Sequence, residues 1–263
     1  MRSVLIFLAM TIWAGAAVGG PFEDAVAAYN RQDYASAFAL FKPLAERGNA
    51  SAQYSVGLMY RNGRGVAKDE QQAVHWYRKA ADQGDAYAQY NLGISYGSGQ
   101  GVAKDDQQAA FWYRKAAEQG DAYAQSNLGA MYANGMGVPP DDQQAVLWYR
   151  KAADQGHAIA QSNLGIMYDK GRGVPLDDRQ AVTWYRKAAD QGNAVGQFNL
   201  GLMIVNGRGV AKDYQQAYFW WLLASASGHT AAARNRDIIE KDLQPAQRAA
   251  AQAAAKEWKP AGR

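Results

Sequence analysis

Cysteine is absent from this chain of 263 residues. Without thiols, the protein has no disulfide bond, no thiol nucleophile and no cysteine-based metal site. Packing alone must therefore stabilise the fold. Histidine is scarce as well: the sequence has three, His75, His157 and His229, in distant parts of the chain. We therefore expect no catalytic residues, no metal ligands and no cofactor.

A strong excess of charge of one sign is also missing. The 28 basic residues exceed the 24 acidic residues only slightly, which gives a formal net charge of +4. So small an excess, spread along the chain, does not indicate a nucleic acid partner. Hydrophobic residues make up 48% of the sequence, which is enough for a packed core and is not typical of a disordered chain.

Long apolar runs are lacking except at the N-terminus. There, Arg2 precedes an apolar run from Val4 to Ala17, and small residues follow this run. The pattern is typical of a signal peptide with an A-x-A-like cleavage site. The run is shorter than the ~20 residues of a spanning helix. We expect residues 1–20 to be a cleaved signal and the mature protein to be periplasmic or secreted, without a stable membrane anchor. The alternative is an uncleaved anchor.

What the sequence does have is internal repetition. The segment Trp-Tyr-Arg-Lys-Ala-Ala recurs every 36 residues, and an altered copy continues the series; the copies begin at Trp76, Trp112, Trp148, Trp184 and Trp220. Glycines follow the same period, at Gly48, Gly84, Gly120, Gly156, Gly192 and Gly228. This period divides residues 49–228 into five repeats.

Each repeat contains two helical patterns. The first, from Ala86 to Tyr96 in one repeat, places small and apolar residues at a helical period. The second follows Asp69, an expected N-cap, with Gln72 completing a predicted capping box. Its apolar residues then occupy one helical face, namely Ala73, Trp76, Tyr77, Ala80 and Ala81.

The glycines have different predicted roles. We expect Gly63 and Gly65 to form the turn between the two helices with positive φ, and Gly84 to end the second helix. Gly57 and its equivalents lie inside the first helix, where glycine costs ~1 kcal/mol relative to alanine. A glycine retained there in every repeat predicts a close approach of two helices.

These fixed positions resemble the Sel1-like repeat, a relative of the tetratricopeptide repeat. The residues that carry the resemblance, shown for one repeat, are Ala124-Gln125-Ser126-Asn127-Leu128-Gly129, Tyr132, Gly135, Gly137-Val138, Asp141, Ala145, Trp148-Tyr149, Lys151-Ala152-Ala153 and Gly156. The resemblance covers roughly residues 34–228. It implies an all-α fold, an α/α superhelical solenoid that stacks helix pairs, and an adaptor of protein complexes, often in the bacterial envelope.

The ends of the chain differ from the middle, as capping units do. Residues 21–48 predict an N-terminal helix pair, in which Pro43 should kink the second helix. Residues 229–263 predict C-terminal capping helices. There, Pro245 begins an alanine-rich helix that ends near Trp258 and covers Leu222 and Leu223.

Positions that vary between repeats are free to face a partner. The third, sixth and thirteenth positions vary and share one face of the first helix, and the resemblance implies that this helix lines the concave surface. Aromatic residues are favoured at interfaces, so we predict that the partner-binding residues are Tyr54, Tyr87, Tyr90, Tyr123 and Phe198. The alternative is that these rings only fill space between repeats.

A second candidate surface is the Arg-Lys ladder of the other helix. It could attract an acidic partner, a polysaccharide or anionic lipid, or it could be an ordinary solvated face. Its members are Arg78, Lys79, Arg114, Lys115, Arg150, Lys151, Arg186 and Lys187.

The leading hypothesis is an exported scaffold that binds another protein, a component of the envelope or a secreted protein, and is not an enzyme. The resemblance implies roles such as restraining a sensor kinase or organising an export complex. The alternative is a hydrolase directed at peptidoglycan or β-lactams. Sel1-like proteins described with that activity carry paired cysteines, which this chain lacks.

Overall fold

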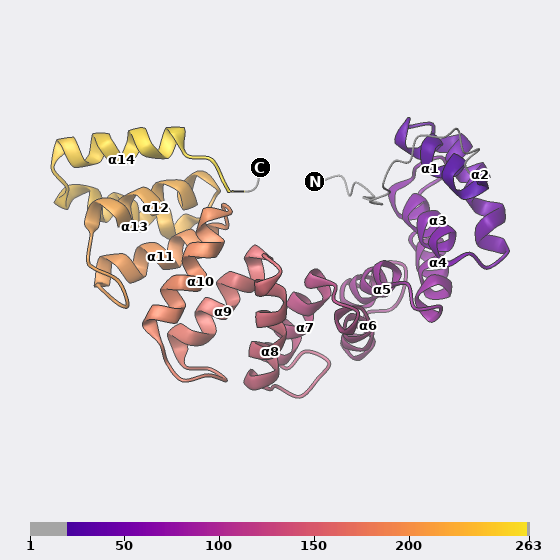
Figure 1. Cartoon of the computed structure of the whole chain (residues 1–263), viewed down its shortest axis with the longest axis horizontal. Helices are drawn as coiled ribbons and strands as arrows, with labels where there is room; N and C mark the ends of the chain where they lie inside the picture. Colours follow the sequence, from indigo (N-terminus) through magenta and orange to yellow (C-terminus); the bar gives the residue numbers. More distant parts are fainter. Residues whose placement is uncertain (1–19, 262–263) are drawn as a thin grey trace.

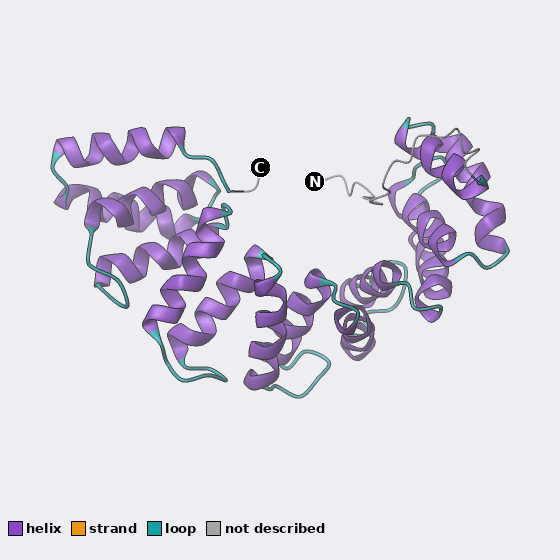
Figure 2. Cartoon of the chain, in the orientation of Figure 1, coloured by secondary structure: helices purple, strands orange, loops and turns teal. Residues whose placement is uncertain are grey.

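The computed structural model of the protein describes residues 20–261. The predicted signal peptide, apart from Gly20, lies outside the described residues. Within residues 20–261 all regular elements are helical and no strand occurs (Figure 2). The predicted all-α solenoid is thereby confirmed.

The five repeats each contain two helices of 13 residues. The first helices are α3 (Ala50–Asn62), α5 (Ala86–Ser98), α7 (Ala122–Asn134), α9 (Ala158–Lys170) and α11 (Ala194–Asn206). The second helices are α4 (Glu70–Asp82), α6 (Asp106–Glu118), α8 (Asp142–Asp154), α10 (Asp178–Asp190) and α12 (Tyr214–Ala226). The chain curves into an arc whose two ends approach the same side (Figure 1). Near its middle, α5 and α7 lie on the inner side of this arc, and α6 and α8 lie on the outer side.

The second helices begin at aspartate caps, as predicted. The side chain of Asp69 accepts hydrogen bonds from the backbone N–H groups of Gln71 and Gln72, both at 2.9 Å. The other half of the predicted capping box is wrong. The N–H of Asp69 donates to the carbonyl of Tyr60 at 3.0 Å, so the loop backbone already satisfies the group that the Gln72 side chain would have reached.

Tryptophans of the repeated segment are buried and join neighbouring repeats. Trp76 packs into a cluster made by residues of α1, α2 and α3, including Phe41 and Val56. Trp148 likewise belongs to the cluster that contains Tyr113 and Leu128. Apolar surface that one helix pair leaves uncovered is therefore covered by the next pair, which makes the core continuous along the solenoid.

Additional helices flank the repeats. At the N-terminus α1 (Pro21–Asn30) pairs with α2 (Tyr34–Glu46), which continues through Pro43 to its last residue. At the C-terminus α13 (Thr230–Ile239), η1 (Glu240–Asp242) and α14 (Pro245–Glu257) follow the last repeat.

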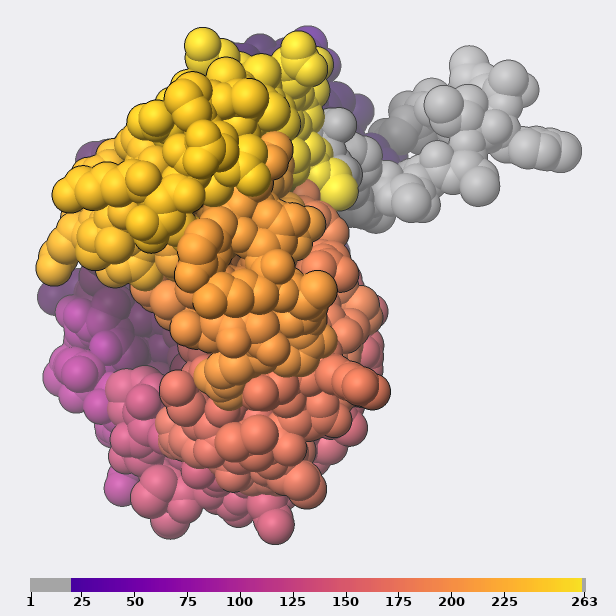
Figure 3. Space-filling view, turned by 90° about the vertical axis from the view of Figure 1, so that its left-hand side faces the viewer, coloured from indigo at the N-terminus to yellow at the C-terminus, as the bar shows by residue number. Residues whose placement is uncertain are grey.

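Helix α14 covers the end of the solenoid. In Figure 3, which looks onto this end, its yellow surface lies over the orange helices that precede it. Leu223 is buried, and Leu222 packs with Ala255 and Trp258 in the same cluster. The prediction that this tail covers the two leucines is confirmed. No helix within residues 20–261 is both long enough and apolar enough to cross a membrane.

Candidate functional site

Two of the predicted partner-binding residues are prominent on the surface. Tyr87 and Tyr123 occupy the first turns of α5 and α7, where the N-caps Asp85 and Asp121 begin each helix. Their exposed fractions are 63% and 59%, so both rings are available to a partner. Among the five predicted residues, these two have side chains that are mostly exposed rather than packed between repeats.

Tyr54 and Tyr90 lie behind them and are partly buried. The ring of Tyr54 contacts that of Tyr87, with centroids 5.9 Å apart, and Tyr90 contacts Tyr123 at 6.0 Å. Each pair joins the first helices of consecutive repeats. We call Tyr54, Tyr87, Tyr90 and Tyr123 the tyrosine stripe.

Burial controls the chemistry of the inner pair. It raises the pKa of Tyr54 to about 12 and also raises the pKa of Tyr90. Both hydroxyls therefore stay neutral at physiological pH, and they are suited to hydrogen bonding rather than to carrying charge or acting as a base.

His157 extends the tyrosine stripe, and sequence reasoning did not select it. Its ring lies 4.8 Å from that of Tyr123, edge-on. Its Nδ1 accepts the backbone N–H of Ala160 at 3.2 Å, so the imidazole caps α9. Burial lowers the pKa of His157. The signal was available, because His157 occupies the repeat position that Asp85 and Asp121 fill as N-caps.

Phe198 is separate from the stripe. It lies on α11, two repeats beyond Tyr123, and stacks on the ring of His229 with centroids 4.4 Å apart. Ser126 and Ser162 fill the equivalent positions between them and are buried. The structure therefore brings together the four tyrosines but not the fifth predicted residue.

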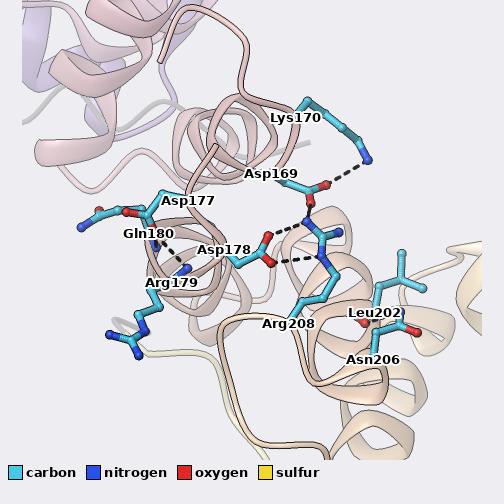
Figure 4. Close-up of polar contacts among 9 residues, drawn as sticks. All are labelled: Asp169, Lys170, Asp177, Asp178, Arg179, Gln180, Leu202, Asn206 and Arg208. Carbon is cyan, nitrogen blue, oxygen red and sulfur yellow. Dashed lines mark hydrogen bonds and ion pairs between the residues drawn. The ribbon is translucent and has the colours of Figure 1, made fainter. Parts of the chain in front are cut away.

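Charged groups mark the same face on both sides of the stripe. In the first repeat, Nη1 of Arg61 donates to Oδ1 of Asn91 at 2.6 Å. In the fourth repeat Asp169 occupies the position equivalent to Arg61. It pairs with Arg208 at 2.7 Å, and Arg208 also pairs with Asp178 (Figure 4). The guanidinium thus links the fourth and fifth repeats.

Three of the four arginines of the Arg-Lys ladder contact the next repeat, whereas Arg186 is exposed. Nη2 of Arg114 donates to the hydroxyl of Tyr132 in the next repeat at 2.7 Å. Arg78 makes the same bond to Tyr96, and Arg150 makes it to Tyr168. These arginines bind neighbouring repeats to one another, so they are not freely available to an acidic partner.

Lysines of the ladder are placed over aromatic rings. Lys151 lies 4.3 Å from the ring centroid of Trp148, and Lys187 lies 4.0 Å from that of Trp184. Such cation–π contacts hold a lysine against its own helix. Across residues 20–261, no group of three or more metal-ligating side chains comes together.

An arc of stacked helix pairs that repeat along the chain defines a helical repeat solenoid. The family model for the Sel1 repeat matches residues 31–49, 50–85, 86–121, 122–157, 158–193 and 194–229. The chain therefore belongs to the Sel1 repeat family. Sel1 repeats mediate contacts between proteins, so the chain is a protein–protein interaction scaffold. These matches do not support the alternative of a hydrolase.

Two solved structures are similar over most of the chain. One is a protective antigen of uropathogenic Escherichia coli strains displaying an SLR fold, with 40% identity over 91% of this chain and a TM-score of 0.85. This chain spans 52% of that protein. The other is a Sel1 repeat protein from Oxalobacter formigenes, with 32% identity, coverage of 93% of this chain and 100% of that one, and a TM-score of 0.80. No curated protein matches the sequence.

Proposed function

We propose that this protein is exported and that its tyrosine stripe binds a protein component of the bacterial envelope or a secreted protein. The observation that carries the proposal is the exposure of Tyr87 and Tyr123, 63% and 59%, in consecutive repeats. Their helices, α5 and α7, lie on the inner side of the arc (Figure 1). Partly buried tyrosines fix these rings from behind, so little side-chain freedom is lost on binding. Tyrosine is also among the residues that dominate binding energy at interfaces.

The proposed location rests on the sequence of the first twenty residues, with Arg2, an apolar run and small residues after it. A scaffold in that compartment could restrain a sensor kinase or organise an export complex, and these remain the two roles that we propose.

Crosslinking and affinity capture from the native organism test the proposal. The bait is the tagged protein, and the test variant is Tyr87→Ala with Tyr123→Ala. The matched control is Phe111→Ala with Leu147→Ala, because these exposed apolar side chains, 47% and 45% exposed, lie on the outer helices α6 and α8. We expect one dominant protein that is captured by the wild type and the control but lost with the test variant.

Circular dichroism of both variants should match the wild type, since all four side chains are exposed. Equal capture by the tyrosine variant and the wild type would contradict the proposed site. Recovery of the protein only from the cytoplasmic fraction would contradict the proposed location.

A further inference from the structure

The last described residues of the chain are seated on one of the turns that recur between repeats. Beyond α14 the chain is extended at Trp258 and reaches the turn between α10 and α11. The N–H of Ala261 donates to the carbonyl oxygen of Asp190 at 2.8 Å. A Cβ placed on Gly192 would lie 3.4 Å from Cγ of Pro260 and 3.6 Å from Cη2 of Trp258. The segment thus binds the turn through two rings and a backbone hydrogen bond.

The same turn recurs in earlier repeats, where the surface is open. Gly84, Gly120 and Gly156 have φ values of +94°, +97° and +87°, close to the +83° of Gly192. A Cβ built on any of the three meets nothing within 4 Å. The three turns share the positive φ of the seated one, and the space beside each glycine is open. The carbonyls of Gly84 and Gly120 are already bonded, because the side chains of Gln119 and Gln155 donate to them at 2.9 and 3.0 Å.

Each open turn also presents an unused hydrogen-bond acceptor. The last carbonyls of a helix have no partner within that helix, and at Asp190 the tail supplies one. No backbone N–H within residues 20–261 donates to the equivalent carbonyls of Asp82, Glu118 and Asp154. An extended segment bound at these turns would satisfy them in the same way.

Charge favours a basic occupant. The side chain at the Asp190 position is acidic in the preceding repeats too, where Asp82, Glu118 and Asp154 are exposed. The segment seated at Asp190 carries Lys259 between its two rings. The lysines of the same last turns, Lys79, Lys115 and Lys151, lie over aromatic rings of their own helices. The exposed carboxylates are therefore left to pair with a basic segment at this edge.

The central turns add an aromatic surface that the occupied one lacks. Tyr87 and Tyr123 follow Gly84 and Gly120 by three residues and are exposed, whereas Val195 holds that position after Gly192. Exposed tyrosines beside the free turns can pack against an incoming ring, with each such aromatic pair adding to the contact.

We propose that the turns at Gly84, Gly120 and Gly156 bind an extended basic segment of a partner protein. In this segment an aromatic residue is followed two positions later by proline, as Trp258 is followed by Pro260 in the chain's own tail. This inference rests on the proposed function, because it names the kind of segment that the scaffold holds.

A labelled peptide tests the inference directly. The probe is the synthetic segment of residues 255–263 carrying fluorescein, titrated with the purified full chain, whose own tail keeps the turn at Gly192 occupied. The control peptide replaces Trp258 and Pro260 by alanine. We expect saturable anisotropy with the first peptide and little with the second.

A charge-neutral variant identifies where the peptide binds. Asp82→Asn, Glu118→Gln and Asp154→Asn together should weaken binding about threefold, because a peptide seated at one turn meets one of these carboxylates and an exposed ion pair contributes only a few-fold. The control, Asp24→Asn with Asp237→Asn and Asp242→Asn, removes the same charge from exposed positions off this edge and should leave affinity unchanged. Circular dichroism verifies the fold of both.

Binding that is absent, equal for the two peptides, or equal for the two variants would overturn the inference. Affinity capture of the partner distinguishes a failure of this inference from a failure of the proposed function. A captured partner that an excess of the peptide fails to displace would overturn the inference and leave the proposed function standing. A captured partner that the peptide displaces supports both.

Discussion

The ring of Tyr113 occupies the space that a side chain on Gly93 would fill. A Cβ built on Gly93 would lie 2.7 Å from both Cδ1 and Cε1 of Tyr113. The second helix of each repeat therefore packs directly on the backbone of the first, as the glycine pattern predicted. The same contact recurs between Gly57 and Tyr77, Gly129 and Tyr149, Gly165 and Tyr185, and, with tryptophan as the partner, Gly201 and Trp221.

Gly93→Ala should lower the free energy of unfolding. The added methyl overlaps the Tyr113 ring, and overpacking of this kind typically costs about 1–3 kcal/mol. Gly97→Ala in the same helix is the matched control. Its Cβ would lie an ordinary 3.6 Å from that of Ala109, and it should gain up to about 1 kcal/mol of helix propensity. Urea unfolding measures both, and a stabilised Gly93→Ala variant would show that the helix pair can separate at no cost.

Ser227→Gln should stabilise the protein. In each of the first four repeats a glutamine at this position donates to a buried glutamine, as Gln155 does to Gln125 at 2.8 Å. Ser227 is too short to do so in the fifth, and Oε1 of Gln197 is buried without a partner. Restoring the bond should add about 1 kcal/mol.

Thermal unfolding compares Ser227→Gln with the wild type. The same substitution in a Gln197→Leu background removes the acceptor and should abolish the gain. A gain that persists there would show that the hydrogen bond to Gln197 is not its source.

Replacing His157 by asparagine should reduce the acid sensitivity of the fold. Burial lowers the pKa of His157 below its ordinary 6.5, so the unfolded chain binds the proton more tightly. Stability is therefore lost as pH falls below about 6.5 towards the lower pKa of the folded state. Asparagine removes this loss and still caps α9, because Asn193 caps α11 in the same way.

Denaturant unfolding at pH 7 and pH 5 tests this expectation. His75→Asn is the control, since His75 is exposed and lies inside α4. If His157→Asn loses as much stability between pH 7 and pH 5 as the wild type does, other groups cause the acid sensitivity.

Arg208→Gln should be more damaging than Arg172→Gln. Both arginines pair with an aspartate of the preceding repeat, Asp178 and Asp142 respectively, but Arg208 also pairs with Asp169, whose side chain is only 12% exposed. Without Arg208 that carboxylate keeps its ion pair with Lys170 at 3.1 Å. The difference should be about 1 kcal/mol, since Arg208 is itself 39% exposed and water screens it.

Thermal unfolding in low and high salt measures the stability that each variant loses. The gap between the losses of Arg208→Gln and Arg172→Gln should narrow as salt increases, because salt screens the ion pairs. Equal losses at low salt would indicate that Asp169 is already satisfied without the arginine.

The sequence alone was sufficient for the repeat, the helix pairs and the roles of the glycines. Such features are local or recur with a fixed period. Three residues illustrate this: Gly57 lies inside a helix, Asp69 precedes one, and Pro245 begins another. Each acts on neighbours a few residues away or recurs at the same position of other repeats.

The site was only partly predictable. A varying repeat position identified Tyr87 and Tyr54 as candidates but could not show that one ring is exposed and the other covered. That outcome depends on the rotation of one repeat against the next. The same rotation places Arg114 against Tyr132, which turned a candidate basic surface into a set of contacts between repeats.

The path of the C-terminal tail was decided by tertiary structure alone. The sequence predicted that Trp258 ends a helix and that this helix covers Leu222 and Leu223, because apolar side chains require cover. It contained no periodic signal that the next residues would turn back to Asp190 and Gly192. That contact joins residues about seventy positions apart, and only the packing of α14 on α12 directs the chain there.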